Sequence, residues 1–348
     1  MRFKKNDIYR IKIPDVKAEE SEKWYDKIKI SGDLRLRHDT QWREEKNGAT
    51  EYARHRERFR FRIGMDSKIN DNTKVGFGLA SGDGEQNTTN QSADEHARGK
   101  GIFIDLAYAD WKASDMLTII GGKHKNPLFT TSLVWDPDVN PEGLSESFGF
   151  NAADRIKLYA NLGQWFIEEL DTKNSDGDPT LLVYQIGSDI KPVDKMKVQF
   201  ALTYYDFLNL DQIDYDDLND DETFIGYNHR HSQQLIFDKN KKLLNEFKCL
   251  EIGIKADLKD VLPVPVSLFG NYIQNLEADT SKLIAQGVNP GDSAPSKLSA
   301  YGNNDRDTGW QLGFSVHNRN TCDPPISSSA RICDTCKSDS QTQFPHCL

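Results

Sequence analysis

Segments in which apolar and polar residues alternate recur along most of this chain. In the clearest of them, arginine occupies every second position from Arg56 to Arg62, and apolar side chains follow the opposite phase at Phe59, Phe61, Ile63 and Met65. Successive side chains of a β-strand point to opposite faces, whereas a helix would spread both sets around its circumference. This segment is therefore predicted to be a strand with one cationic face and one apolar face.

The same alternation appears before and after the arginine segment. Residues 28–37 place one apolar set on a single face, namely Ile28, Ile30, Leu34 and Leu36. Similar patterns occur at 75–80, 102–108, 117–123, 156–162, 182–186, 196–204, 250–258 and 310–317. Together with segments around Phe148 and from Val264, they predict an all-β fold of about twelve strands.

Polar connections of two kinds alternate between these segments. Short turns are expected at 70–72, 113–115, 191–194 and 259–260, and long loops at 81–100, 126–143, 171–179, 208–247 and 277–307. Transmembrane β-barrels combine brief periplasmic turns with wide external loops, whereas a soluble sandwich has no reason to sort its loops. We therefore predict an antiparallel transmembrane β-barrel of at least about twelve strands, with aromatic girdles near the strand ends that include Trp42, Trp111, Trp165 and Trp310.

The pattern divides the chain into three regions. Residues 1–26 are charged and unpatterned, and we predict a periplasmic leader that is irregular or contains a short helix. Residues 27–317 form the predicted barrel, and residues 318–348 a disordered or non-native, cysteine-containing tail. Because an open sheet edge in lipid leaves backbone groups unpaired, either the barrel closes at about twelve strands or the chain is incomplete. We favour the second alternative.

Composition and charge disfavour several other classes of protein. Hydrophobic residues make up 37% of the chain and the mean hydropathy is -0.68, and no run approaches the roughly 18 apolar residues of a membrane helix. The net charge of -10 disfavours nucleic-acid binding. Before residue 322 the one cysteine is Cys249, which argues against a disulfide scaffold. The chain carries no recognisable export signal and is expected to be a mature or 5′-incomplete form, since any apolar core of a signal peptide is interrupted by Asn6, Asp7, Arg10 and Lys12.

Several local sequences resemble a known family. Residues 30–37, 62–64 and 69–72 are similar to the opening of the bacterial putative outer-membrane porins, and the segments 121–127 and 135–144 are similar to that family's loop region. The similarity is specific over 27–144 and diffuse from there to 316. It implies a β-barrel pore in the bacterial outer membrane, together with a signal peptide and further C-terminal strands that this chain lacks.

The polar face of the predicted strands would line a water-filled lumen. Arginines that faced lipid instead would cost about 2–4 kcal/mol each at mid-bilayer, and rows of Arg or Lys make a pore favour anions. The alternative is a solvent-facing strand of a soluble sheet. The predicted pore-lining residues are Lys29, Asp33, Arg35, Arg37, Arg56, Arg58, Arg60, Arg62, Asp105, Glu251 and Lys255.

The proline-bearing segment 135–143 is a candidate constriction. We predict a loop folded into the lumen, whose carboxylates Asp136, Asp138 and Glu142 face the arginines and narrow the pore. A Ca²⁺ site is the alternative reading of the same oxygen ligands, but the glycine of an EF-hand loop is missing. Replacing Asp136 and Asp138 by Asn should change the conductance or ion preference.

No motif indicates covalent chemistry or a cofactor. The single Cys333-x-x-Cys336 is a weak zinc motif without a second pair, and no catalytic signature appears. We predict that the protein is not an enzyme and binds no metal or cofactor. Its predicted function is that of an outer-membrane porin, in contact with lipid, through which ions and small hydrophilic solutes diffuse passively. A homo-oligomer remains open. The alternative is a soluble all-β sandwich that binds carbohydrate or another ligand, and an outer-membrane enzyme is a third class.

Overall fold

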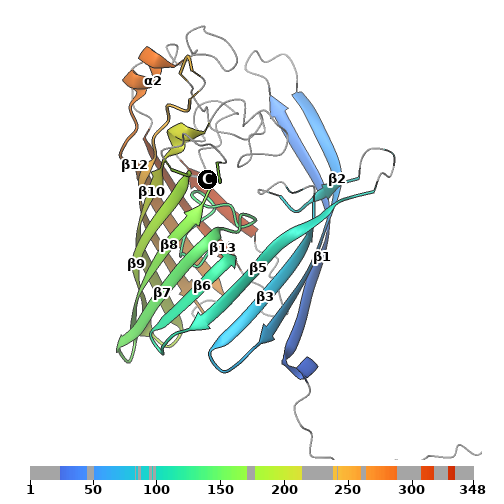
Figure 1. Ribbon diagram of the computed structural model, residues 1–348, viewed down its shortest axis with the longest axis vertical. Helices are drawn as coiled ribbons and strands as arrows, with labels where there is room; N and C mark the ends of the chain where they lie inside the picture. Colours follow the sequence, from blue (N-terminus) through green and yellow to red (C-terminus); the bar gives the residue numbers. More distant parts are fainter. Residues whose placement is uncertain are drawn as a thin grey trace, which may run out of the picture.

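The computed structural model of the protein describes residues 24–44, 51–82, 84, 88–93, 96, 99–170, 177–213, 238–240, 242–259, 264–287, 307–316 and 328–333. These residues form one antiparallel sheet in which each strand, apart from the two-residue β4, pairs with the next along the chain. The sheet curves strongly, with β1–β3 on one side and β9–β12 on the opposite side (Figure 1).

The strands match the alternating segments of the sequence. Their bounds are β1 (Ile28–Glu44), β2 (Glu51–Lys68), β3 (Thr73–Ser81), β5 (Ile102–Lys112), β6 (Leu117–Lys123), β7 (Glu142–Ala153), β8 (Ile156–Phe166), β9 (Thr180–Val193), β10 (Met196–Leu208), β11 (Lys248–Leu258), β12 (Val266–Asn275), β13 (Thr308–Val316) and β14 (Ser328–Cys333). The two-residue β4 (Gln91–Ser92) lies off this path and pairs with β2. The prediction of an all-β antiparallel fold is confirmed.

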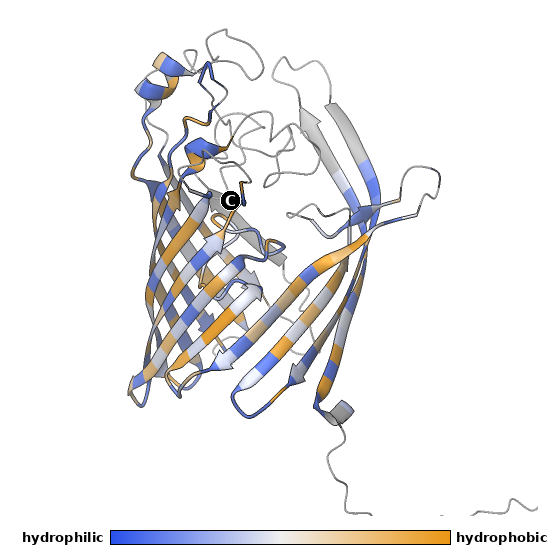
Figure 2. Ribbon diagram, viewed as in Figure 1, coloured by the Kyte–Doolittle hydropathy of each residue, from blue (hydrophilic) through white to orange (hydrophobic). Residues whose placement is uncertain are grey.

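The two faces of the sheet have opposite chemistry. On the outer face of β1, Ile30 is 73%, Leu34 68% and Leu36 77% exposed. The inner face buries polar side chains, among them Asn161, Gln185, Thr203, Glu251, Asn271 and Gln311. Figure 2 shows the resulting alternation of hydrophobic and hydrophilic residues along the strands. A soluble sandwich would bury its apolar face between two sheets, so that alternative is wrong, and an apolar exterior around a polar interior is the wall of a membrane barrel.

The connections are sorted by length between the two ends of the sheet. Turns of a few residues join strands at 69–72, 113–116, 154–155, 194–195 and 259–265, and long connections span 82–101, 124–141, 167–179, 209–247 and 276–307. The turns at 69–72, 113–116, 154–155 and 194–195 gather at the lower end of the molecule (Figure 1). The predicted alternation of short and long connections is confirmed.

A β-bulge in β5 changes which of its side chains face inward. Gly78 pairs with Leu106, but its neighbour Leu79 pairs with Ile104, so Asp105 is an extra residue on β5. Asp105 is 5% exposed and faces the interior, whereas Ile104 is 53% exposed on the outer face. Uniform alternation over 102–108 is therefore wrong, because the bulge shifts the phase by one residue.

The C-terminal end of the sheet also differs from the prediction. Within the predicted tail, Ser328–Cys333 form β14, which pairs with β13 from Gln311 to Val316. For these six residues a disordered tail is wrong, because the edge of β13 offers backbone groups that a further strand can pair. Among the described strands, β1 and β14 each pair with one neighbour, so the sheet is not closed. The rest of the tail and most of the leader lie outside the described residues.

The helices within the described residues are short. They are the 3-10 helices η1 (Trp24–Lys27) and η3 (Leu210–Gln212) and the helix α2 (Thr280–Gln286) in the connection between β12 and β13. In the part of the chain that the structure describes, no helix is long and apolar enough to cross a membrane.

Candidate functional site

The connection between β6 and β7, residues 124–141, is here called the crossing loop because it folds across the inner face of the sheet. At one end, Asn140 Nδ2 donates to Asp105 Oδ1 on β5 at 2.6 Å. In its middle, Thr131 Oγ1 donates to Gln311 Oε1 on β13 at 3.2 Å. Since β5 and β13 lie far apart in the sheet order, the loop spans the interior between opposite parts of the wall.

Buried polar side chains of the wall hold the middle of the crossing loop. Gln185 makes two hydrogen bonds to the backbone of Phe129, accepting from its N–H at 3.0 Å and donating to its carbonyl at 2.9 Å. Thr130 Oγ1 donates to Glu251 at 3.1 Å, and Glu251 also accepts from Tyr205 Oη at 2.7 Å. A buried polar group left unpaired costs about 1–3 kcal/mol, so these contacts favour one position of the loop.

An aromatic contact anchors the second half of the crossing loop. Trp135 packs edge-on against Trp165 of β8, with ring centroids 5.1 Å apart. Both indole N–H groups are satisfied, since Trp135 donates to the Val139 carbonyl and Trp165 to Ser145 Oγ. His124 Nε2 lies 3.2 Å from the same Ser145 oxygen, and burial lowers the pKa of the His124 imidazole below its usual value. The packed rings and the satisfied N–H groups therefore hold this half of the crossing loop against β8.

Arginines of β1 and β2 face the interior opposite the crossing loop. They form the arginine ladder, which consists of Arg35, Arg37, Arg56, Arg58, Arg60 and Arg62. The register sets Arg35 opposite Arg60 and Arg37 opposite Arg58. Arg60 makes two hydrogen bonds to Asp33, at 3.1 and 2.6 Å. Asp39 pairs with Arg56 at 2.5 Å and with Arg37 at 3.1 Å.

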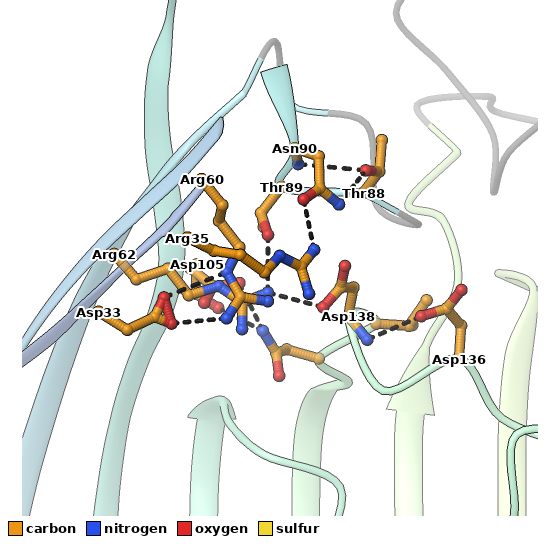
Figure 3. A network of polar contacts seen from close by, with 12 residues as sticks. Asp33, Arg35, Arg60, Arg62, Thr88, Thr89, Asn90, Asp105, Asp136 and Asp138 are labelled. Carbon is orange, nitrogen blue, oxygen red and sulfur yellow. Dashed lines mark hydrogen bonds and ion pairs between the residues drawn. The ribbon is translucent and has the colours of Figure 1, made fainter. Parts of the chain in front are cut away.

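The ladder and the crossing loop meet at one ion pair. Arg62 Nη2 lies 2.7 Å from Asp138 Oδ1, and the two side chains are 21% and 17% exposed. Asp136 shapes the turn that presents Asp138, because its Oδ1 accepts from the Asp138 N–H at 2.8 Å. Figure 3 shows Asp138 pointing toward the arginines while Asp136 lies beyond it. Cations on the wall thus face an anion on the loop.

The remaining residues that the sequence predicted for the pore lie in different places. Asp105 and Glu251 are buried on the inner face and hold the crossing loop. Lys255 shares the face of Glu251 and pairs with Asp257 at 3.1 Å, and Lys29 shares the face of Asp33. Glu142 differs from the prediction, because it begins β7 and pairs with Lys123 across the strands, away from the ladder.

Sequence reasoning missed several residues that position the loop. Trp165 was expected in an aromatic girdle, which is wrong, since it is 2% exposed on the inner face. Its place in the alternation of β8, one residue from the outward Phe166, could have indicated this. The pairing of Gln185 with Phe129 left no comparable signal, because it joins residues that are 56 positions apart.

Among the residues that the structure describes, no three or more His, Cys, Asp or Glu side chains lie close enough together to hold a metal ion. Cys336, the second cysteine of the Cys-x-x-Cys motif, lies outside those ranges.

Comparisons with known proteins bear on this arrangement. Residues 49–234 match the family model described as "Putative porin", which is more than half of the chain. The search of curated proteins gives no significant match. Among solved structures, Salmonella typhi OmpF in complex with daunomycin is 9% identical, with a TM-score of 0.42 over 88% of this chain and 96% of that one.

Two further solved structures show the same level of similarity. The outer-membrane channel DcaP of Acinetobacter baumannii is 11% identical, with a TM-score of 0.41 over 88% of this chain and 90% of that one. OprB of Pseudomonas putida is 14% identical, with a TM-score of 0.43 over 84% and 70%. The extent of the family match, together with the antiparallel sheet and its apolar exterior, shows that the chain belongs to the family of putative porins, the outer-membrane β-barrel proteins.

Proposed function

We propose that the protein lets ions and small hydrophilic solutes diffuse through the bacterial outer membrane, with the crossing loop and the arginine ladder as the narrowest part of the passage. The ion pair between Arg62 and Asp138 carries this proposal, because it brings charges of opposite sign together inside the wall. The predicted pore-lining role of the ladder, and the predicted constriction by Asp138, rest on the same contact.

The proposed passage works by size exclusion and by a field across its width. The ladder presents guanidinium groups on one wall, while the loop presents Asp138. A solute with a dipole aligns with such a field, and a large solute is excluded by the loop. Selection among ions in such a passage needs no cofactor, since rings of charged side chains and a restricted width are enough.

Single-channel recording in planar lipid bilayers tests the proposal. Asp138→Asn removes one negative charge from the loop. A unit charge at about 8 Å from a passing ion in water contributes about 0.5 kcal/mol. Removing that charge favours chloride and disfavours potassium by this amount each, so we expect the ratio of chloride to potassium permeability, measured from the reversal potential, to rise about sixfold. Asp194→Asn in the turn between β9 and β10 is the matched control, because Asp194 lies outside the interior and its side chain is 91% exposed.

Two results would contradict different parts of the proposal. A protein that shows heat-modifiable migration on a gel but produces no current steps is not a channel. A channel whose selectivity is the same in Asp138→Asn as in the wild type has no constriction at Asp138. Association into a homo-oligomer stays a prediction, which chemical cross-linking in detergent tests.

A further inference from the structure

We infer that Arg35 and Arg58 form a binding site for a divalent oxyanion of the phosphate or sulfate class on the ladder. The inference rests on the proposed function, because it names the class of solute that the constriction holds. Its evidence is the uneven distribution of partners along the ladder.

The arginine ladder carries more positive charge than its carboxylate partners neutralise. Six guanidinium groups face three carboxylates, Asp33, Asp39 and Asp138. Four of the arginines use them: Arg60 pairs with Asp33, Arg37 and Arg56 share Asp39, and Arg62 pairs with Asp138. Among the described residues, no carboxylate forms an ion pair with Arg35 or Arg58.

Arg35 and Arg58 instead converge on neutral oxygens of one loop residue. Arg35 Nη2 donates to Asn90 Oδ1, and Arg58 Nη2 donates to the Asn90 carbonyl at 3.1 Å. A longer contact of 3.4 Å joins Arg58 to Thr88 Oγ1. The Nε atoms of Arg35, Arg56, Arg58 and Arg62 are all buried without an acceptor within the described part of the chain, so what sets Arg35 and Arg58 apart is that neither has a carboxylate partner for its Nη groups there. Figure 3 shows Arg35 reaching toward Asn90, above the Arg62–Asp138 pair.

The placement of the two arginines suits a shared ligand. They are diagonal neighbours on one face, since Arg35 is opposite Arg60 and Arg58 is opposite Arg37, and diagonal side chains in such a pair are about 7–8 Å apart at their Cα atoms and within reach of one another. Partly buried charges normally have an ionic partner. Two adjacent guanidinium groups with only amide and hydroxyl acceptors are a site at which an anion replaces weak partners.

The chemistry of the guanidinium group selects the class of anion. Its planar fork of N–H donors matches the paired oxygens of phosphate, sulfate or carboxylate groups. A divalent oxyanion can accept from both arginines at once and offsets their two charges. Chloride carries one charge on one acceptor atom, so it cannot offset both guanidinium charges or give each fork a pair of acceptors. The side-chain amide of Asn90, which now donates to Thr88 Oγ1, is a further donor beside the site.

Block of chloride current by inorganic sulfate tests the inference. Sulfate is added to the purified protein in planar bilayers, and the concentration that halves the chloride current is measured. We expect Arg35→Gln and Arg58→Gln each to raise this concentration about tenfold, the effect of losing a hydrogen bond to a charged group. Arg56→Gln is the matched control: it removes an equal charge from the same ladder, but Arg56 already has Asp39 as a partner, and we expect a change of less than about twofold.

A conservative variant separates geometry from charge. Arg35→Lys keeps the positive charge but lacks the fork, so we expect chloride current to persist while block by sulfate weakens. Heat-modifiable migration on a gel confirms that each variant folds, and titration calorimetry of the detergent-refolded protein measures sulfate binding without relying on current.

The outcomes distinguish the two proposals. If the wild type conducts chloride but sulfate neither blocks it nor binds, the anion site is absent and the channel stands. If Arg56→Gln weakens the block as much as Arg58→Gln does, the ladder attracts anions as a whole and the discrete site is wrong. Sulfate binding that depends on Arg35 and Arg58 in a protein without current supports the site and overturns the channel.

Discussion

At the residue scale, each partner of an arginine on the inner face determines what that arginine can do. Arg60 is held by two hydrogen bonds to Asp33, and a bidentate pair of this kind fixes the guanidinium plane. Arg62 is held by an acid on the crossing loop instead, so it couples the wall to the loop. Arg60 and Arg62 are thus arginines on the same face of one strand, but the first is fixed to the wall and the second binds the loop.

Glycine at the end of β6 is required by the backbone. Gly122 has φ +107, and a Cβ atom there would lie 2.3 Å from the Ala107 carbonyl oxygen of β5. We expect Gly122→Ala to lower the free energy of unfolding by at least about 1–2 kcal/mol, because both the conformation and the space exclude a side chain. Urea titration of the refolded protein, followed by tryptophan fluorescence, measures this change.

Gly121→Ala is the matched control for that prediction. The added Cβ at Gly121 would meet Leu144 at 3.8 Å, which is ordinary van der Waals contact. We expect its unfolding free energy to stay within about 0.5 kcal/mol of the wild type. Equal losses in the two variants would show that the local backbone of β6 is not what makes glycine necessary.

At the scale of elements, the crossing loop depends on contacts with strands that are distant in sequence. Gln185→Leu removes both hydrogen bonds to the Phe129 backbone and leaves the partly buried N–H and C=O of Phe129 without these partners, at up to about 1–3 kcal/mol for each group. We expect the loop to leave its position more often. Single-channel recordings should then show larger open-channel current noise.

Gln199→Leu is the control for the loop prediction, since Gln199 of β10 donates to Asp189 of the neighbouring strand β9 at 2.9 Å. Current noise that rises equally in both variants would mean that the wall, and not the loop, is the source. Unchanged noise in Gln185→Leu would show that the Phe129 contact does not hold the loop.

The strands of this protein could be predicted from the sequence much better than its loop contacts. Alternation such as that of Arg58, Phe59 and Arg60 fixes which face of a strand is apolar, because the period of a strand is two residues. The bulge at Asp105 interrupts that period without a local signal such as glycine or proline. Opposite charges on the strand and the loop were enough to predict that the loop faces the arginines. That Arg62 pairs with Asp138 in particular depends on the path of the loop, which no local sequence pattern specifies.

At the scale of the whole molecule, the two ends of the wall are expected to face different compartments. The long connections should lie outside the cell and the short turns in the periplasm. Lys239 lies in the long connection between β10 and β11, and Ser114 in the turn between β5 and β6. In a background in which the five cysteines are replaced by serine, Lys239→Cys should react with a membrane-impermeant maleimide in intact cells.

Ser114→Cys supplies the contrasting measurement. Its labelling should require permeabilisation of the outer membrane, because the turn faces the periplasm. Labelling of Ser114→Cys in intact cells, with Lys239→Cys protected, would reverse the orientation. The two positions are both exposed, so a difference in labelling reports the side of the membrane and not burial.

The meander in which each described strand except the two-residue β4 pairs with the one that follows it has a consequence for how such a wall can evolve. A hairpin of the main path can be inserted or lost without rerouting any other connection, because the described strands of that path are neighbours in sequence order. The girth of the wall, and with it the calibre of the conduit, can therefore change in steps of two strands while the pairing elsewhere is inherited intact.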